Sequence, residues 1–245
     1  MDVRRARPRR PRRGLGRNRG VTTFALVHGA WHGAWCWERL EPELEARGHD
    51  VVAVDLPCDD PSLGSADYAT VVTRALDGVA DDVVVVGHSL AGLAIPLVAL
   101  ERQVRRLVFL CALIPQVGLS LREQEGVFVD GFGAALVRDE LDRSYWPDGA
   151  AEQGMYPECP PEAAAWASAR LRRQARLPNV ETTPLETWPA VESTYVVCAR
   201  DHAVDPAWSR RAARERLGVE AIELDAGHSP FLTCPRELAD LLTGS

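Results

Sequence analysis

An apolar run that ends in a cramped turn constrains this chain more than any other feature. Residues 83–86 are four consecutive valines, which is typical of a strand buried on both faces. They lead into Gly87-His88-Ser89-Leu90-Ala91-Gly92, and a helical run of small apolar residues follows up to Leu100. Small residues on both sides of Ser89 allow a helix to follow the strand through a tight turn. The pattern therefore predicts a strand–turn–helix unit that presents the Ser89 hydroxyl at its tip, as a candidate nucleophile.

The rest of the chain repeats this alternation of apolar strands and helices. Pro96 lies inside the helix after Ser89 and is expected to bend it, since proline removes a backbone donor. Strands that alternate with helices and are apolar on both faces predict an α/β fold with a mostly parallel sheet covered on both sides. Strands are expected at 23–27, 51–54, 83–86, 104–113, 193–198 and 219–224, and helices at about 35–46, 68–76, 90–100, 161–177, 206–217 and 235–242.

The alternation stops between residues 114 and 190, where tryptophans, tyrosines and prolines gather. We interpret 114–190 as a mainly helical cap inserted after the strand near 104–113. The core then comprises residues 21–113 and 191–245. Residues 1–20 hold nine arginines and one acidic residue, with no apolar segment, and are expected to form a disordered tail. An arm that binds RNA or a membrane is the alternative interpretation of this tail.

Composition excludes several classes of function. The remaining 225 residues carry 19 of the 28 cationic residues and 34 of the 35 acidic ones, so their net charge of −15 disfavours nucleic-acid binding. The chain has no lysine, which excludes Schiff-base catalysis and a P-loop. Its six cysteines are scattered, so we expect reduced thiols, no metal site and a cytoplasmic protein. No apolar run reaches the ~20 residues that span a bilayer, and we expect no membrane association.

Two further side chains complete a candidate catalytic triad. A serine hydroxyl needs a base to become a nucleophile at neutral pH. Asp201 follows the strand expected at 193–198, and His228 follows the one expected at 219–224. Serine, acid and histidine in this chain order, each after a strand, predict a triad of Ser89, Asp201 and His228. Asp205 remains the alternative acid, although its place before Pro206 suits a helix N-cap.

Stabilisation of a tetrahedral intermediate requires two backbone donors for its oxyanion. We expect them to be the amides of Leu90, directly after the nucleophile, and Ala30, in the loop after the first strand. His28 is expected to brace that loop and His88 to serve in packing. His202 is expected to be a solvent-facing neighbour of the triad.

Three segments carry a resemblance to a known family: residues 24–37, FALVHGAWHGAWCW; residues 87–92, GHSLAG; and residues 227–231, GHSPF. They resemble the α/β-hydrolase superfamily, in its plant methylesterase and hydroxynitrile lyase group with the bacterial esterase relatives. The resemblance implies the α/β-hydrolase fold, the triad, the oxyanion pair and cofactor-free hydrolysis of small carboxylic esters. The lyases have threonine after the first-strand histidine and lysine after the catalytic one. Here Gly29 and Ser229 stand there, which disfavours cyanohydrin cleavage.

We therefore expect a serine carboxylesterase that acts on a small apolar or aromatic ester. Thioesterase, lactonase, carbon–carbon hydrolase or acyltransferase chemistry would use the same parts, and a non-catalytic ligand-binding protein is a further alternative. The cap aromatics Trp146 and Trp166 are candidates for substrate contact, or else form the core of the cap. The arginines at 170, 172, 173 and 176 favour a solvated helix face over an anion site. The sequence leaves open whether the chain forms a homodimer.

Overall fold

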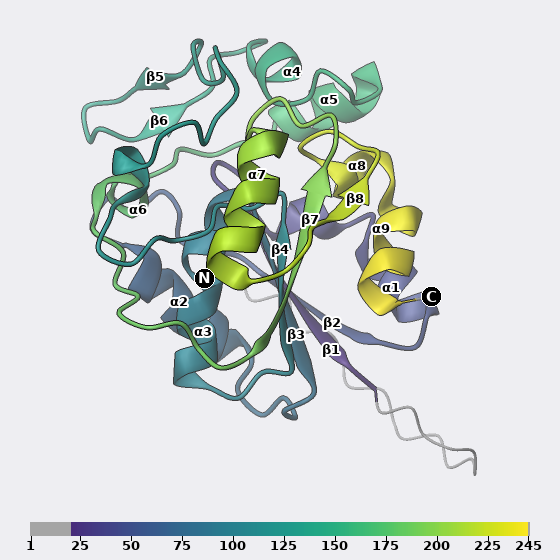
Figure 1. Ribbon diagram of the computed structural model, residues 1–245. Coiled ribbons are helices and arrows are strands. Elements are labelled where there is room, and N and C mark those ends of the chain that lie inside the picture. The colour runs from purple at the N-terminus through teal and green to yellow at the C-terminus, as the bar shows by residue number, and fades with distance from the viewer. Residues whose placement is uncertain (1–20, 245) are drawn as a thin grey trace.

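Six parallel strands form the central sheet of the computed structural model, which describes residues 21–244 (Figure 1). The predicted α/β fold with a mostly parallel sheet is confirmed. The tail predicted for residues 1–20 lies outside the described residues. The strand order is β2-β1-β3-β4-β7-β8. The strands are β1 (Thr23–Val27), β2 (Asp50–Val54), β3 (Val83–His88), β4 (Arg106–Leu110), β7 (Glu192–Cys198) and β8 (Ile222–Leu224).

The two central strands explain why the valine run is so apolar. All five residues of β1 and all six of β3 are buried, because helices cover both faces of the sheet. The register pairs Val27 with Gly87, so both strands end at the same level. The loop that follows β1 and the turn that follows β3 therefore emerge side by side at the carboxyl edge.

Helices cover the sheet on both faces (Figure 1). Helices α2 and α3 lie against each other on one face, and α1 and α9 lie against each other on the opposite face. Helix α7 packs against β7. The helices of the core are α1 (Glu41–Ala46), α2 (Ser65–Ala75), α3 (Ile95–Glu101), α7 (Pro206–Ala212), α8 (Pro230–Thr233) and α9 (Pro235–Thr243).

Two predicted helices of the core are shorter than the apolar patterns indicate. The helix expected at 35–46 is a 3-10 turn, η1 (Ala34–Trp37), followed separately by α1. The helix after Ser89 consists of the 3-10 turn η2 (Ser89–Leu93) and then α3, so Pro96 stands in the first turn of α3 instead of bending a continuous helix. Proline is well tolerated in a first turn, whose amides have no partner in the helix. The strands predicted at 104–113 and 219–224 are also longer than the observed strands β4 and β8.

Most of the chain between β4 and β7, called the inserted segment below, lies over the carboxyl edge of the sheet, and its last part runs back to the start of β7 (Figure 1). This segment is less helical than predicted, because it includes an antiparallel pair of short strands. The helix expected at 161–177 ends at Ser168. The elements of the segment are η3 (Leu121–Glu123), β5 (Val137–Arg138), β6 (Ser144–Tyr145), α4 (Ala151–Gly154), α5 (Pro161–Ser168) and α6 (Leu177–Val180). Within residues 21–244, no helix is long and apolar enough to cross a bilayer.

Candidate active site

Ser89 stands at a sharp backbone turn between β3 and η2. Its φ is +52°, a left-handed value that non-glycine residues rarely adopt. Neighbouring glycines make the turn sterically feasible. A Cβ at Gly87 would lie 2.8 Å from Ile95 Cγ2, and a Cβ at Gly92 would lie 2.0 Å from the carbonyl oxygen of Leu113. Small residues are therefore required on both sides of the serine, as the sequence predicts.

The structure brings Ser89, His228 and Asp201 together in one hydrogen-bonded chain. The Nε2 atom of His228 lies 3.0 Å from Ser89 Oγ, and its Nδ1 atom lies 2.7 Å from Asp201 Oδ2. Both His228 and Asp201 are buried. The other carboxylate oxygen of Asp201 accepts hydrogen bonds from the amides of Ala203 at 2.7 Å and Val204 at 3.0 Å. These amides orient the carboxylate, which in turn fixes the orientation of the imidazole.

Asp205, the alternative acid, is engaged elsewhere. Its carboxylate accepts hydrogen bonds from the amides of Ala207 at 2.7 Å and Trp208 at 2.8 Å. This is the N-cap geometry of α7, in which a side-chain oxygen satisfies amides that have no partner within the helix. The position of Asp205 thus supports Asp201 as the partner of His228.

The loop after β1 approaches Ser89 closely enough to supply a backbone donor. Ala30 and Leu90 both line the cavity that Ser89 opens into. The Ala30 amide has no hydrogen-bond partner among the described residues. The Leu90 amide belongs to the first turn of η2, where amides lack a partner within the helix. Both amides are available to a bound oxygen.

Gly29 makes this close approach feasible. A Cβ at this position would lie 2.7 Å from Ser89 Cβ and 2.9 Å from His88 Nδ1. The site thus has no room for the threonine that the lyases carry after their first-strand histidine. This geometry agrees with the sequence argument against cyanohydrin cleavage.

Two buried, neutral histidines, His28 and His88, form hydrogen bonds to the backbone around the site. The Leu56 amide donates to His28 Nε2 at 2.9 Å, so Nδ1 carries the proton and donates to the Gly29 carbonyl at 2.8 Å. His88 Nε2 lies 2.8 Å from the carbonyl oxygen of His228. Desolvation, with the nearby Arg172 as the next cause, lowers the pKa of His28 to about 3. Desolvation also lowers the pKa of His88 well below its usual value. His28 thus braces the loop after β1, as expected from the sequence, whereas His88, expected to serve in packing, also hydrogen-bonds to the backbone of His228.

Two residues of the inserted segment hold the loop after β1, and sequence reasoning missed both. Arg172 donates to the carbonyl oxygens of His32 at 2.8 Å and Leu56 at 2.9 Å. Tyr156 lies with its hydroxyl 2.9 Å from His32 Nε2, while His32 Nδ1 lies 2.7 Å from the Ala30 carbonyl. Burial is the main cause that lowers the pKa of His32 to about 4. No local sequence pattern predicts the contacts of Arg172 and Tyr156 with this part of the core, because their partners lie more than 100 positions away in the sequence.

The expectation of a solvated helix face for the arginines at 170, 172, 173 and 176 is wrong, because none of the four lies within a helix; Arg176 lines the cavity over Ser89, and Arg172 contacts the core. Helix α5 ends at Ser168, so Arg172 lies in an irregular segment. Its backbone amide donates to the Trp31 carbonyl at 2.7 Å, and its guanidinium also pairs with Asp55 at 3.2 Å. The segment that carries Arg172 is thereby attached directly to the core.

The cavity over Ser89 has a volume of about 700 Å³. The apolar part of its wall includes Trp31, Phe128, Phe132 and Leu136. The two tryptophans that the sequence offered for substrate contact do not line it. Trp146 packs behind the wall against Trp31, with ring centroids 5.8 Å apart. Trp166 packs against Trp35 at 5.2 Å and stacks under the Arg170 guanidinium. Both belong to the packing of the inserted segment, the second of the two interpretations.

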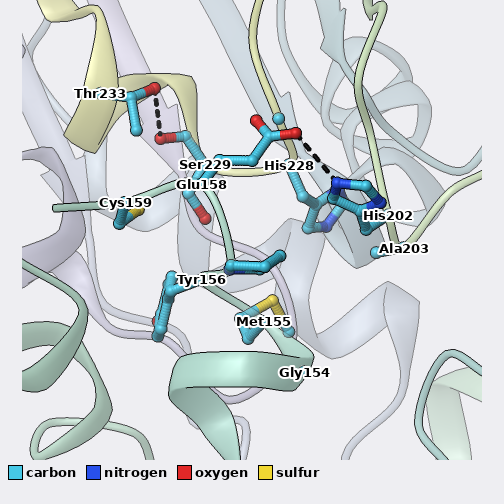
Figure 2. A pocket seen from close by; sticks show the side chains of 12 residues that line it. Gly154, Met155, Tyr156, Glu158, Cys159, His202, Ala203, His228, Ser229 and Thr233 are labelled. Carbon is cyan, nitrogen blue, oxygen red and sulfur yellow. Dashed lines mark hydrogen bonds and ion pairs between the residues drawn. The ribbon is translucent and has the colours of Figure 1, made fainter. Parts of the chain in front are cut away.

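A smaller pocket lies beside His228, where the inserted segment packs on the loops that carry Asp201 and His228 (Figure 2). Glu158 points to His202, and Glu158 Oε1 lies 3.0 Å from His202 Nε2. The His202 side chain is 56% exposed, in agreement with the predicted solvent-facing position. A Cβ at Gly227 would lie 2.0 Å from Glu158 Oε2, so the inserted segment directly contacts the backbone that carries His228.

One group of residues among positions 21–244 has metal-ligand geometry. His88, Cys111 and His228 place their ligand atoms within 4.8 Å of one another. Burial raises the pKa of the Cys111 thiol well above its usual value, which disfavours the thiolate that a metal requires. His228 is also already bonded to Ser89 and Asp201. We therefore assign no metal to this group.

Comparison with known proteins places this site in a family. The alpha/beta hydrolase family matches residues 24–241. The chain is 30% identical to salicylic acid-binding protein 2 of Nicotiana tabacum, over 88% of this chain and 93% of that protein. It is 32% identical to probable esterase PIR7A of Oryza sativa subsp. indica, over 91% and 96%.

A solved structure shows the same fold. The novel pyrethroid hydrolase from Sphingobium faniae JZ-2 superposes with a TM-score of 0.79 at 23% identity, and the match covers 92% of this chain and 97% of that one. The family match and the relatives together establish the class of enzyme, which is that of the carboxylic ester hydrolases. The chain belongs to the alpha/beta hydrolase family and to its methylesterase-like group.

Proposed function

We propose that this protein is a serine carboxylesterase in which Ser89 is the nucleophile, His228 the general base and acid, and Asp201 the residue that orients His228. One observation carries the proposal: the continuous chain from Ser89 Oγ through both ring nitrogens of His228 to Asp201, at 3.0 and 2.7 Å. An imidazole that bridges a hydroxyl and a buried carboxylate is able to accept the hydroxyl proton while the carboxylate stabilises the resulting imidazolium.

The reaction follows from these positions. Ser89 Oγ attacks the ester carbonyl carbon as its proton passes to His228 Nε2. The amides of Ala30 and Leu90 donate to the oxyanion of the tetrahedral intermediate. The bond to the alcohol then breaks, the alcohol leaves with the proton from His228, and the acyl group remains on Ser89. A water molecule, deprotonated by His228, attacks this acyl-enzyme and releases the acid and free Ser89.

The lining of the cavity supports a small ester with an apolar or aromatic part. Trp31, Phe128 and Phe132 present aromatic surface in the cavity that contains Ser89. The tobacco relative is a protein that binds salicylic acid, an aromatic carboxylic acid, which would correspond to the acid product of such an ester. We also propose a cytoplasmic location, which the six free cysteines support.

A fluorophosphonate probe tests the nucleophile directly, because such probes modify activated serines. We expect the probe to label the protein at Ser89, as read by peptide mass spectrometry, and to abolish turnover of p-nitrophenyl acetate. Ser89→Ala should lose both labelling and turnover while its melting temperature stays close to that of the wild type. Labelling at another serine, or turnover that survives in Ser89→Ala, would contradict the proposed nucleophile.

A further inference from the structure

The cavity over Ser89 has arginines in its wall as well as aromatic residues. Arg122 of η3, Arg138 of β5 and Arg176 at the start of α6 all line it. Asp142 is the one acidic residue among the described residues that line this cavity. The cavity therefore carries two excess positive charges within a body whose net charge is −15.

The charges on this wall are only partly neutralised. Arg138 Nη1 lies 3.1 Å from Asp142 Oδ1, and Arg176 Nη1 pairs with Asp142 Oδ2. One carboxylate is thus shared by two guanidinium groups. Asp142 holds both arginines at the cavity by using only part of their donors, since a guanidinium has five N–H groups.

Arg122 is different, because no acid pairs with it. Its side chain is exposed, and the described part of the chain offers its guanidinium no hydrogen-bond partner and no carboxylate within 4.0 Å. The neighbouring Glu123 forms no ion pair with Arg122; its carboxylate accepts from the amide of Ser120 at 2.8 Å and from the Ser120 hydroxyl at 2.6 Å. The other arginines of the inserted segment are engaged: Arg143 and Arg173 pair with Asp139, and Arg170 stacks on Trp166.

We propose that Arg122, Arg138 and Arg176 form a recognition site for a carboxylate on the substrate. This inference rests on the proposed function, and it narrows the substrate class to an ester whose acyl part carries a second, free carboxylate. A guanidinium binds a carboxylate through paired N–H groups, and this interaction is stronger than one between neutral partners. Such a half-ester places its ester group at Ser89, its chain along Trp31 and Phe132, and its free carboxylate at the three arginines.

The test compares two p-nitrophenyl esters of adipic acid: mono-p-nitrophenyl adipate, which has a free carboxylate, and its neutral methyl ester. The corresponding glutarate and suberate pairs vary the distance between the p-nitrophenyl ester group and the free carboxylate. We expect the acidic ester to have the higher kcat/KM, by about tenfold, and higher salt to reduce the ratio because it screens exposed charges. Arg122→Gln should reduce the ratio of acidic to neutral kcat/KM by about fivefold, a modest effect for a solvent-exposed charge. Arg74→Gln, an exposed arginine of α2 outside the cavity, is the matched control and should leave the ratio unchanged.

Two outcomes separate this proposal from the proposed function. If Ser89-dependent turnover of the neutral esters is present but no acidic ester is preferred at any length, or if Arg122→Gln leaves the ratio unchanged, the carboxylate site is refuted and the esterase stands. If no ester is hydrolysed, the proposed function fails, and calorimetric binding of monomethyl adipate to Ser89→Ala tests the site alone. Binding that weakens in the Ser89→Ala, Arg122→Gln double variant supports the site, and equal or absent binding refutes it.

Discussion

Arg172 holds the carbonyl of His32 with two guanidinium nitrogens, Nη2 at 2.8 Å and Nε at 3.0 Å. His32 lies two residues after Ala30, whose amide we assign to the oxyanion site. The inserted segment thus helps to set the position of a donor that belongs to the core.

We expect Arg172→Lys to lower kcat/KM for p-nitrophenyl acetate by roughly 10- to 100-fold. An ammonium group is a point charge that does not reproduce the planar fork of arginine, and loss of an oxyanion donor costs at most about 10²–10³ in kcat. Arg173→Lys is the matched control. Its guanidinium is half-exposed and pairs with Asp139 at 3.0 Å, so activity should stay within about twofold. Equal effects of the two substitutions would contradict a role for Arg172 in holding the loop.

The two candidate acids are separated by parallel substitutions. Asp201→Asn should reduce kcat by about 10⁴, because an amide does not enforce the tautomer in which His228 Nε2 accepts the serine proton. Asp205→Asn should keep both activity and stability, since asparagine is an equally good N-cap residue. Steady-state kinetics and melting curves measure both effects. An activity loss confined to Asp205→Asn would transfer the role of triad acid to that residue.

Gly29→Ala is expected to reduce kcat by about 10² or more, because the added methyl group would lie 2.7 Å from Ser89 Cβ and displace either the serine or the Ala30 amide. Rates of labelling by a fluorophosphonate, compared with steady-state kcat, distinguish a displaced nucleophile from a displaced oxyanion donor. A variant with wild-type kcat would show that the loop after β1 can move away from Ser89 without consequence.

Stability should fall as the solution is acidified from pH 6.5 to pH 5. Burial lowers the pKa of His28 to about 3 and that of His32 to about 4, whereas histidines of an unfolded chain titrate near 6.5. Below pH 6.5 the unfolded chain therefore binds protons that the folded chain does not. The free energy of unfolding should decrease by up to about 1.4 kcal/mol per pH unit for each of these histidines.

Chemical denaturation at a series of pH values measures this slope. His32→Gln should make the slope shallower, whatever its effect on stability at pH 7, because one of the titrating groups is gone. A free energy of unfolding that does not change between pH 6.5 and pH 5 would mean that these histidines become protonated in the folded protein.

The sequence predicts the sheet and the proximity of Ser89, Asp201 and His228 for physical reasons. A strand buried on both faces needs an uninterrupted apolar run. The apolar runs at β1 and β3 therefore predict buried strands, and every residue of both strands is buried. The carboxyl ends of parallel strands meet at one edge, so residues within a few positions of the ends of β3, β7 and β8 come together there. Ser89, Asp201 and His228 all do so.

The errors arise where tertiary contacts override local patterns. The apolar spacing after Ser89 and after Trp35 suits one long helix, but both segments contain a 3-10 turn before the α-helix. In the inserted segment, Trp146 was expected to contact substrate as much as to pack internally, and its ring lies behind Trp31. Arg172 reaches a loop 140 residues away, and no local pattern encodes such a contact.

The left-handed φ of Ser89 means that the residue most comfortable at this point of the backbone is glycine, which has no hydroxyl. The backbone conformation at residue 89 therefore favours a residue that lacks the hydroxyl group on which reactivity depends. Selection of this protein for thermal stability alone would favour substitutions at residue 89 that abolish its activity. Variants selected for thermal stability therefore need to be assayed for turnover at every round.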